Sequence, residues 1–330
     1  MKKLIPAAVA TALLLTACGN GNYASTQIPA KPEPAPTTAA PPVVADCQGV
    51  NPLASFKPDG PLPAPGQMPA GSFMEKIQKR GRLIAGVSAD SYNLGYRDPI
   101  TGQIQGFDID MIYAVADAIF GEPLPGEPHQ VELRVISSPD RIPALRDTKN
   151  PVDIVARNMT INCARWKQIA FSAEYYRSGQ KTLVQRDSKA EDADDLSGQT
   201  ICAPAGSTSL ENLKKRNPKI NPVTADTDTG CLVLFQQGKA QGISGDDTVL
   251  AGDVAQDPYA KVLPERFSEE PYGLGIALTN PDFVKFVNGV LEKIKANGEW
   301  KASYDRWLAP ALGRAPAPPV PIYGRPVPPQ

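Results

Sequence analysis

The chain has 330 residues, of which 34 are basic and 35 are acidic, so that its formal net charge is −1. A chain of this length is expected to form about two domains rather than one small core. The balanced charge argues against a nucleic-acid partner, because no basic face is available to neutralise phosphates.

The N-terminal residues indicate export. Two lysines precede an apolar run over residues 4–15, which is too short to span a bilayer as a mature helix and has the layout of a signal peptide. The run ends in Leu15-Thr16-Ala17-Cys18, which is similar to a lipoprotein box. We therefore expect residues 1–18 to be a lipoprotein signal peptide and Cys18 to carry a lipid that anchors the mature chain to the membrane. The alternative is an ordinary signal peptide that contains an incidental cysteine.

Two proline-rich segments flank the central part of the chain. Residues 19–70 contain 12 prolines and few large apolar side chains, and residues 310–330 contain 8 prolines. Segments of this composition bury too little surface to fold, so we expect a mobile tether at 19–70 and an unpacked tail at 310–330. A docking motif is the alternative role for the tail.

The central residues alternate between strand-like and helix-like patterns. In the first part, strands are expected at 83–87, 131–136 and 153–156, and helices at 108–120 and 139–147. The pattern then repeats, with strands at 200–203, 222–224 and 242–244 and helices at 208–216, 229–238 and 246–255. Such alternation predicts an α/β fold in which each sheet is flanked by helices.

Two β-rich segments, residues 174–182 and 270–278, separate the two sets of elements. We expect both segments to cross between two lobes. Lobe one would consist of residues 71–176 and 273–309, and lobe two of residues 177–272. Two crossings make a hinge, and the cleft between two lobes is the expected ligand site.

Residues 141–172 are the most informative block of the sequence. Asn162 is a suitable N-cap for a helix that follows the short strand 153–156. Thr160 and Arg165 therefore lie between the end of that strand and the first turn of the helix. Small ligands bind at this position in open α/β sheets, and a helix N-terminus favours negative charge. The planar guanidinium group of Arg165 suits a carboxylate, because it can engage both oxygens at once.

The same block resembles the polar amino-acid branch of the bacterial periplasmic solute-binding proteins, where the pattern runs R-I-P-A-L, then V-D, then T-I-T-x-x-R. Further segments match this family in order, at 106–110, 171–176, 206–209, 246–248 and 297–308. The resemblance implies the two-lobe type II periplasmic binding protein fold, with two crossover hinge strands. It also implies a lipoprotein that binds glutamine, glutamate or aspartate for an ABC transporter.

An α-amino acid presents a carboxylate and an ammonium group, so its receptor needs a cation and an anion about one molecule's width apart. Arg165 meets the first need, and Asp247, which follows a predicted strand, meets the second. The backbone N–H groups of Ser207 and Thr208, at the start of a helix in lobe two, are expected to add donors. The alternatives are that Arg165 is a solvent-exposed cation and that Asp247 caps a helix. We assign the capping or solvated role to Asp246.

The resemblance adds two contacts from the loop before Arg165. They are the hydroxyl group of Thr160 and the backbone carbonyl of Asn158. Tyr92, in the loop after the first strand, is expected to cover the aliphatic part of the ligand. Ordinary loop packing is the alternative for Tyr92.

Arg141 is expected to determine which side chain the ligand carries. Arg141 and Arg165 against Asp247 leave the site with one net positive charge, which complements glutamate or aspartate. Asparagine and glutamine should bind more weakly, because they leave a buried guanidinium group unpaired. The alternative is a surface ion pair between Arg141 and Asp140 or Asp110.

Four cysteines remain after Cys18, which in an exported chain indicates two disulfides with three possible pairings. We favour Cys202 with Cys231, because both fall in predicted lobe two, and this leaves Cys47 with Cys163. No cysteine or histidine spacing typical of a metal site is present, and no nucleophile or phosphate-binding motif. We therefore expect no metal, no cofactor and no enzymatic activity.

The resemblance and these features together imply a monomeric extracytoplasmic lipoprotein. We expect it to capture an acidic amino acid in the interlobe cleft and to deliver it to the membrane permease of an ABC transporter. One alternative is a binding protein of the same fold that reports its ligand to a membrane signalling partner. Another is a dehydratase-type enzyme of the same fold, which needs a poised acid or base in the cleft.

Overall fold

The computed structural model describes residue 47 and residues 49–327. The predicted signal peptide and the predicted lipidation at Cys18 lie outside the described residues. All described residues belong to one unit. Within this part of the chain, every helix is too short or too polar to cross a membrane.

Lobe one is built on a five-stranded sheet in the order β6-β2-β7-β15-β8. The central strand β2 pairs in parallel with β6 and β7, and β15 pairs antiparallel with β7 and β8. All five residues of β2 are buried, as expected for a strand that helices cover on both faces. The strands are β2 (Leu83–Val87), β6 (Val131–Val135), β7 (Ile154–Ala156), β8 (Ala170–Phe171) and β15 (Gly275–Ile276).

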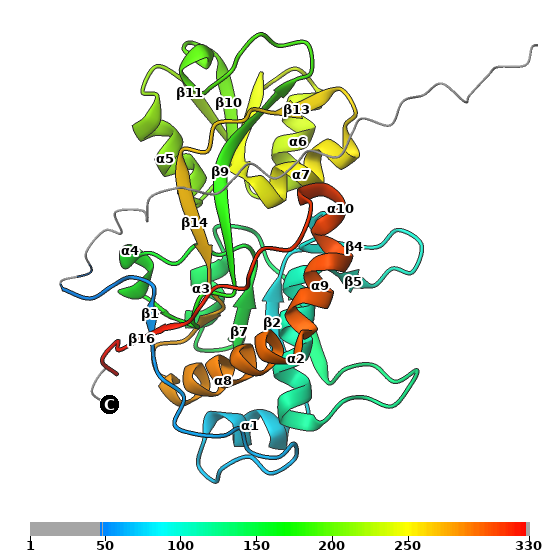
Figure 1. Ribbon diagram of the computed structural model, residues 1–330, viewed down its shortest axis with the longest axis vertical. Helices are drawn as coiled ribbons and strands as arrows, with labels where there is room; N and C mark the ends of the chain where they lie inside the picture. Colours follow the sequence, from blue (N-terminus) through cyan, green and yellow to red (C-terminus); the bar gives the residue numbers. More distant parts are fainter. Residues whose placement is uncertain (1–46, 48, 328–330) are drawn as a thin grey trace, which may run out of the picture. The chain divides into compact units, whose positions relative to one another are not determined.

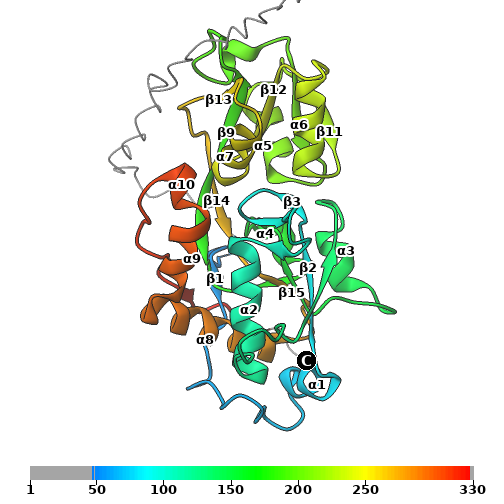
Figure 2. The same cartoon turned by 90° about the vertical axis from the view of Figure 1, so that its right-hand side faces the viewer.

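Six helices accompany this sheet among the described residues, and a seventh, α10, follows α9 and contacts lobe two. Figure 2 shows α2 and α3 on opposite sides of β2. The first helix begins where the Ser72 hydroxyl accepts a hydrogen bond from the Glu75 N–H group, and it ends at Gly81 in the left-handed conformation. The helices are α1 (Phe73–Arg80), α2 (Phe107–Phe120), α3 (Arg141–Arg146), α4 (Cys163–Trp166), α8 (Pro281–Asn297), α9 (Glu299–Trp307) and α10 (Ala309–Leu312). A small sheet of β3 (Asp90–Ser91), β4 (Gly95–Arg97) and β5 (Ile104–Gln105) precedes α2.

Lobe two is built on a second sheet in the order β11-β10-β12-β9-β13. Figure 1 shows α5 on one side of this sheet and α6 and α7 on the other. The strands are β9 (Tyr176–Gln185), β10 (Thr200–Pro204), β11 (Asn221–Ala225), β12 (Gly242–Asp246) and β13 (Ala260–Val262). The helices are α5 (Thr208–Arg216), α6 (Asp228–Gln236) and α7 (Asp247–Gln256), with a short 3-10 helix at Asp194–Leu196.

Two antiparallel strands connect the lobes. They are β9, which also belongs to the sheet of lobe two, and β14 (Ser268–Tyr272), which pairs with β9 from Ser268↔Gln180 to Tyr272↔Tyr176. Figure 1 shows both strands running between the two sheets. Each lobe has its own apolar core, because one large buried cluster surrounds Phe107 and Trp300 and separate clusters surround Leu183 and Val184.

The proline-rich segments are more ordered than the sequence predicts. Phe56 is buried against Trp166, with ring centroids 6.0 Å apart, and Met68 is buried in the core of lobe one. β1 (Ala54–Ser55) pairs in parallel with β16 (Ile322–Tyr323) of the tail. The prediction of an unpacked tether to residue 70 and of an unpacked tail is therefore wrong for these parts. A few well-placed side chains suffice, because proline has already restricted the unfolded chain and lowers the entropy lost on packing.

The described residues contain two disulfides, Cys47–Cys163 and Cys202–Cys231. This is the pairing that we favoured among the three. The first bond joins the segment before β1 to the start of α4, and the second joins β10 to α6. The N-terminal segment is thus held covalently to the helix that carries Arg165.

Candidate functional site

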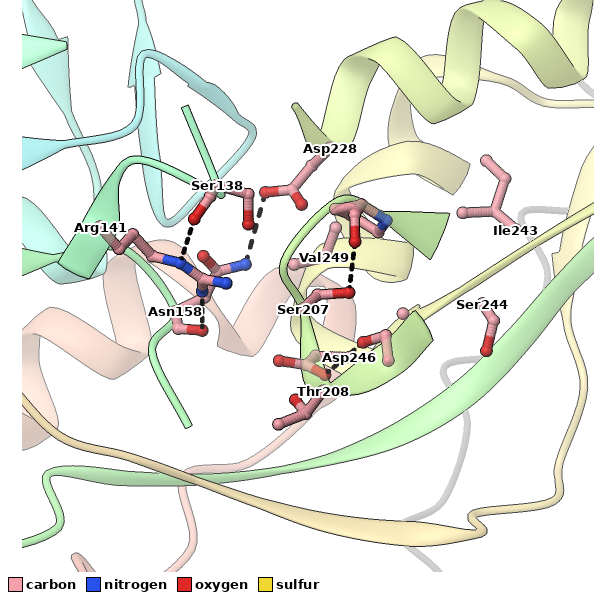
Figure 3. A pocket seen from close by; sticks show the side chains of 13 residues that line it. Ser138, Arg141, Asn158, Ser207, Thr208, Asp228, Ile243, Ser244, Asp246 and Val249 are labelled. Carbon is pink, nitrogen blue, oxygen red and sulfur yellow. Dashed lines mark hydrogen bonds between the residues drawn. The ribbon is translucent and has the colours of Figure 1, made fainter. Parts of the chain in front are cut away.

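A small pocket receives side chains from both lobes (Figure 3). From lobe one come Ser138, Arg141 and Asn158. Lobe two contributes residues from the starts of α5, α6 and α7 and from β12. Its polar residues in the pocket include Ser207, Thr208, Asp228 and Asp246. Its free space is about 380 Å³ with the open rim included. The pocket thus lies where predicted strand ends and helix starts of both lobes meet.

Arg141, at the first position of α3, is buried in this pocket. Its Nε donates to the Ser138 carbonyl at 2.8 Å, and its Nη1 donates to the carbonyls of Arg157 and Asn158 at 3.2 and 3.3 Å. Within the described residues, no carboxylate oxygen lies within 4.0 Å of this guanidinium group. Burial lowers the pKa of Arg141 well below its usual value, and the nearby Arg165 lowers it further.

The alternative of a surface ion pair for Arg141 is not observed. Asp140 accepts a hydrogen bond from the Ser137 hydroxyl, and Asp110 accepts from Ser303 and Trp307. Arg141 therefore presents a buried cation without a carboxylate partner to the pocket, and its contact with a ligand stays a prediction.

Arg165 is also buried, which excludes the alternative of a solvent-exposed cation. Its backbone N–H donates to the side chain of Asn162, the N-cap of α4, at 2.9 Å. Its Nη1 donates to the Thr160 carbonyl at 2.7 Å and its Nη2 to the Gly206 carbonyl at 3.3 Å. Desolvation by burial lowers the pKa of Arg165, whereas the charge of Glu270 acts in the opposite direction.

Both arginines of lobe one donate to the same oxygen atom of lobe two. The Nη2 of Arg141 lies 3.2 Å from the Gly206 carbonyl oxygen that also accepts from Arg165. Gly206 has φ +65°, and a Cβ there would lie 3.2 Å from the Pro139 Cα. The loop before α5 therefore fits closely against lobe one, and its carbonyl oxygen lies where an anionic oxygen would accept from both guanidinium groups.

Ser207 and Thr208, predicted to donate N–H groups to the ligand, line the pocket, but their hydrogen bonds go to other residues of the protein. The N–H of Ser207 donates to the Pro204 carbonyl at 3.3 Å, and its hydroxyl accepts from the Leu210 N–H at 3.1 Å, which caps α5. The Thr208 hydroxyl donates to Glu270 at 2.7 Å. Ser207 therefore shapes the start of α5 and has no N–H group to spare in this conformation.

The structure places Asp246, and not Asp247, at the pocket, although Asp246 also stands at the N-cap position of α7 without a capping bond from its side chain. Asp246, the last residue of β12, lines the pocket and is buried, whereas Asp247 does not line it. Asp247 accepts from the Ser178 hydroxyl at 2.6 Å and lies 4.0 Å from Arg266. Consecutive residues at a strand end face opposite directions, so an error of one residue selects the wrong carboxylate.

A cation next to Asp246 would stabilise its charged carboxylate form. It accepts from the Tyr272 hydroxyl at 2.7 Å and from the Ser209 hydroxyl at 3.4 Å. Desolvation raises the pKa of Asp246 well above its usual value, and the charge of Glu270 raises it further. An ammonium group placed beside Asp246 would relieve both effects and stabilise the carboxylate form.

Glu270, on the hinge strand β14, is a residue that the sequence analysis missed. It is buried and accepts from the Thr160 hydroxyl of lobe one at 2.6 Å and from the Thr208 hydroxyl of lobe two at 2.7 Å. Thr160 does not line the pocket, but both threonines border a wider groove on the hinge side. The hydroxyl of Thr160, predicted to contact the ligand, instead binds the hinge carboxylate.

Asn158 and Tyr92 differ from their predicted roles. The Asn158 carbonyl accepts from Arg141, and its side-chain amide donates to Asp228 at 3.4 Å across the pocket (Figure 3). Tyr92 does not line the pocket, and its ring packs on Tyr96 with centroids 4.8 Å apart. Its predicted contact with the ligand is therefore not supported, and the alternative of loop packing applies.

The described residues hold no group of three or more His, Cys, Asp or Glu side chains arranged to bind a metal ion. The pocket holds the guanidinium group of Arg141 and the carboxylates of Asp228 and Asp246. Arg165 does not line it, but it donates to the same Gly206 carbonyl as Arg141. Groups of both charge signs are thus present in the pocket.

Comparison with known proteins identifies the family. The Bacterial extracellular solute-binding proteins, family 3, match residues 83–310. The glutamine-binding protein of Geobacillus stearothermophilus is 36% identical over 213 residues, which are 64% of this chain and 79% of that protein. The glutamate/aspartate import solute-binding protein of Salmonella typhimurium is 27% identical over 246 residues, which are 72% of this chain and 80% of that protein.

A solved structure supports the same conclusion. Holo ArgBP from T. maritima superimposes with a TM-score of 0.61 and 27% identity, covering 71% of this chain and 98% of that chain. The fold is thus the mixed α/β type II periplasmic binding protein fold that the sequence predicted. The chain belongs to family 3 of the bacterial extracellular solute-binding proteins.

Proposed function

We propose that this protein binds an amino acid in the pocket between its lobes and supplies it to an ABC transporter, with glutamate or aspartate favoured over asparagine or glutamine. The observation that carries the proposal is the convergence of Arg141 and Arg165 on the Gly206 carbonyl, with the buried Asp246 in the pocket that Arg141 lines. The relatives named above are glutamine-binding and glutamate/aspartate-import proteins, which supports a polar or acidic amino acid.

The zwitterionic part of the ligand has a partner at each end. The α-carboxylate would replace the Gly206 carbonyl oxygen as the acceptor for Arg165. The ammonium group would lie against Asp246, which we propose in place of Asp247. Charge-assisted hydrogen bonds of this kind are about twice as strong as neutral ones, so they provide most of the orientation.

The positive charge of Arg141, which no carboxylate of the protein balances directly, selects the side chain of the ligand. Glu270 partly balances Arg165, since its carboxylate is held by the Thr160 hydroxyl next to the Arg165 contact. Arg141 donates only to carbonyl oxygens. A side-chain carboxylate would give Arg141 a full counter-charge, whereas an amide would not.

Capture requires the lobes to separate and close again. The Gly206 loop must move away from the arginines before a carboxylate can reach them, and it must return for Asp246 to meet the ammonium group. Ligand favours the closed state because only that state places groups of both lobes on the same molecule. We propose capture without chemical change, so the ligand should be recovered intact after incubation.

The proposal extends to the membrane. We propose that Cys18 carries a lipid and that the monomeric closed form docks on the permease. Incorporation of labelled palmitate into the wild-type protein, with a Cys18→Ser control, tests the anchor. Capture of a transporter permease from solubilised membranes supports delivery, whereas capture of a signalling receptor alone would contradict it.

A thermal-shift screen against the twenty amino acids, followed by calorimetry, tests the ligand. A ligand that binds only the folded state raises its stability by RT ln(1 + [L]/Kd), so glutamate or aspartate should produce the largest shift. A largest shift with arginine, lysine or an apolar amino acid would contradict the proposal.

A further inference from the structure

A third buried arginine lies behind the pocket. The side chain of Arg157, which follows β7, has no exposed surface, and its Nε donates to the Ile136 carbonyl at 3.0 Å. Within the described residues, neither Nη1 nor Nη2 has a hydrogen-bond partner. Arg157 does not line the pocket, and neither of its Nη atoms reaches the Gly206 carbonyl that Arg141 and Arg165 share.

Two carboxylates bracket this guanidinium group. Nη1 lies 3.7 Å from Asp228 Oδ2, and Nη2 lies 3.7 Å from Asp90 Oδ1. Asp90 has further partners, since it accepts from the Ser88 hydroxyl at 2.8 Å and from the Thr229 N–H at 3.1 Å. A buried cation requires such compensation, and its single charge is shared between the two acids, so that it offsets part of the charge of each.

Asp228 is the member of this group that faces the pocket. It is buried at the start of α6, and the same Oδ2 accepts from the Asn158 amide and from the Ser91 hydroxyl. Arg141 lines the same pocket, and the charge of Asp228 acts on it. Figure 3 shows Asp228 across from Arg141, with the Asn158 amide reaching toward Asp228.

We propose that Arg157 is a positioning residue that makes the pocket selective for an acidic side chain, because its charge offsets that of Asp228. This inference rests on the proposed function. With Arg157 in place, Arg141 keeps its charge for the ligand. Without it, Asp228 repels a side-chain carboxylate and offers Arg141 an internal counter-ion, so that an amide side chain is no longer at a disadvantage.

The test is the ratio of glutamate to glutamine affinity, measured by calorimetry in a set of variants. Arg157→Met should lower the ratio at least about tenfold, which corresponds to about 1.4 kcal/mol. Asp228→Asn should raise the ratio, and the double variant should return it toward the wild-type value. Arg134→Met, which removes a partly exposed arginine paired with Glu132 on β6, is the matched control and should leave the ratio unchanged.

The outcomes separate this inference from the proposed function. If the wild type prefers glutamate but no variant changes the ratio, Arg157 is only structural and the inference is overturned. If Arg157→Met does not fold, Asp228→Asn still decides, because an unchanged or lowered ratio in that variant overturns the inference. If the wild type binds neither amino acid, the proposed function fails and the inference fails with it.

Discussion

The contrast between Asp246 and Asp247 provides a sharp test of the site. Asp246→Asn keeps the size of the side chain and its ability to accept from Tyr272, but it removes the charge. Asp247→Asn makes the same change one residue away, outside the pocket. We expect the first variant to lose most ligand affinity and the second to keep it.

The burial of the two carboxylates sets the expected magnitudes. Asp246 is 6% exposed, and removing one partner from a buried, hydrogen-bonded charge pair costs about 2–5 kcal/mol, or roughly 30- to 5,000-fold in Kd. The side chain of Asp247 is 22% exposed and its nearest cation is 4.0 Å away. A surface pair of this kind contributes at most about 1 kcal/mol, or roughly fivefold.

Without ligand, Asp246→Asn should not lower the stability of the folded protein, although it lowers ligand affinity. Because desolvation raises the pKa of Asp246, the charged carboxylate is unfavourable in the empty folded protein near neutral pH. Asp246→Asn removes this cost and should melt at the same temperature as the wild type or higher. Calorimetry for affinity and scanning calorimetry for melting separate lost binding from lost folding. Loss of binding in Asp247→Asn with retention in Asp246→Asn would refute this assignment.

Four further predictions concern specificity, proton coupling and stability. Arg141→Met should reduce glutamate affinity more than glutamine affinity, and equal losses in calorimetry would contradict its role. Ligand affinity should fall as the pH drops, because the raised pKa of Asp246 favours its protonated form and the ligand's ammonium group must displace that proton. Calorimetric titrations in two buffers with different ionisation heats would report the released proton, and equal heats in both would contradict the coupling. Burial raises the pKa of Asp108 from 3.8 to about 6, so its contribution to stability is present below pH 3.8 and is lost as the pH rises through about 6. Asp108→Asn should abolish a decrease of about 3 kcal/mol in unfolding free energy over that range, and an identical pH profile in urea titrations would argue against it. Replacing Cys47 and Cys163 by serine should lower the unfolding free energy by about 2–5 kcal/mol, because their bond closes a loop of 116 residues in the unfolded chain; a melting temperature equal to the wild type would contradict this.

Local signals account for what the sequence predicted well. The strand Ile154–Ala156 is apolar and short, and Asn162 is a strong N-cap, so both the loop and the start of α4 follow from neighbouring residues. These two elements place Arg165 at a strand end beside a helix start. The alternation of strands and helices likewise predicts the two sheets.

Tertiary contacts account for what the sequence could not predict. Glu270 is one carboxylate among several on an extended hinge segment, and only folding brings Thr160 and Thr208 to it. Phe56 looks like an isolated aromatic residue in a proline-rich segment until Trp166 provides a surface for it. Side chains whose partners lie more than 50 residues away carry no local pattern, so neither role is visible in the sequence.

A crystal structure of the protein with L-glutamate bound tests the central claim most directly. The account predicts the α-carboxylate within hydrogen-bond distance of Arg165, the ammonium group on Asp246, and the side-chain carboxylate on Arg141. Glutamate bound in the wider groove beside Glu270, or with its ammonium group on Asp247, would contradict it.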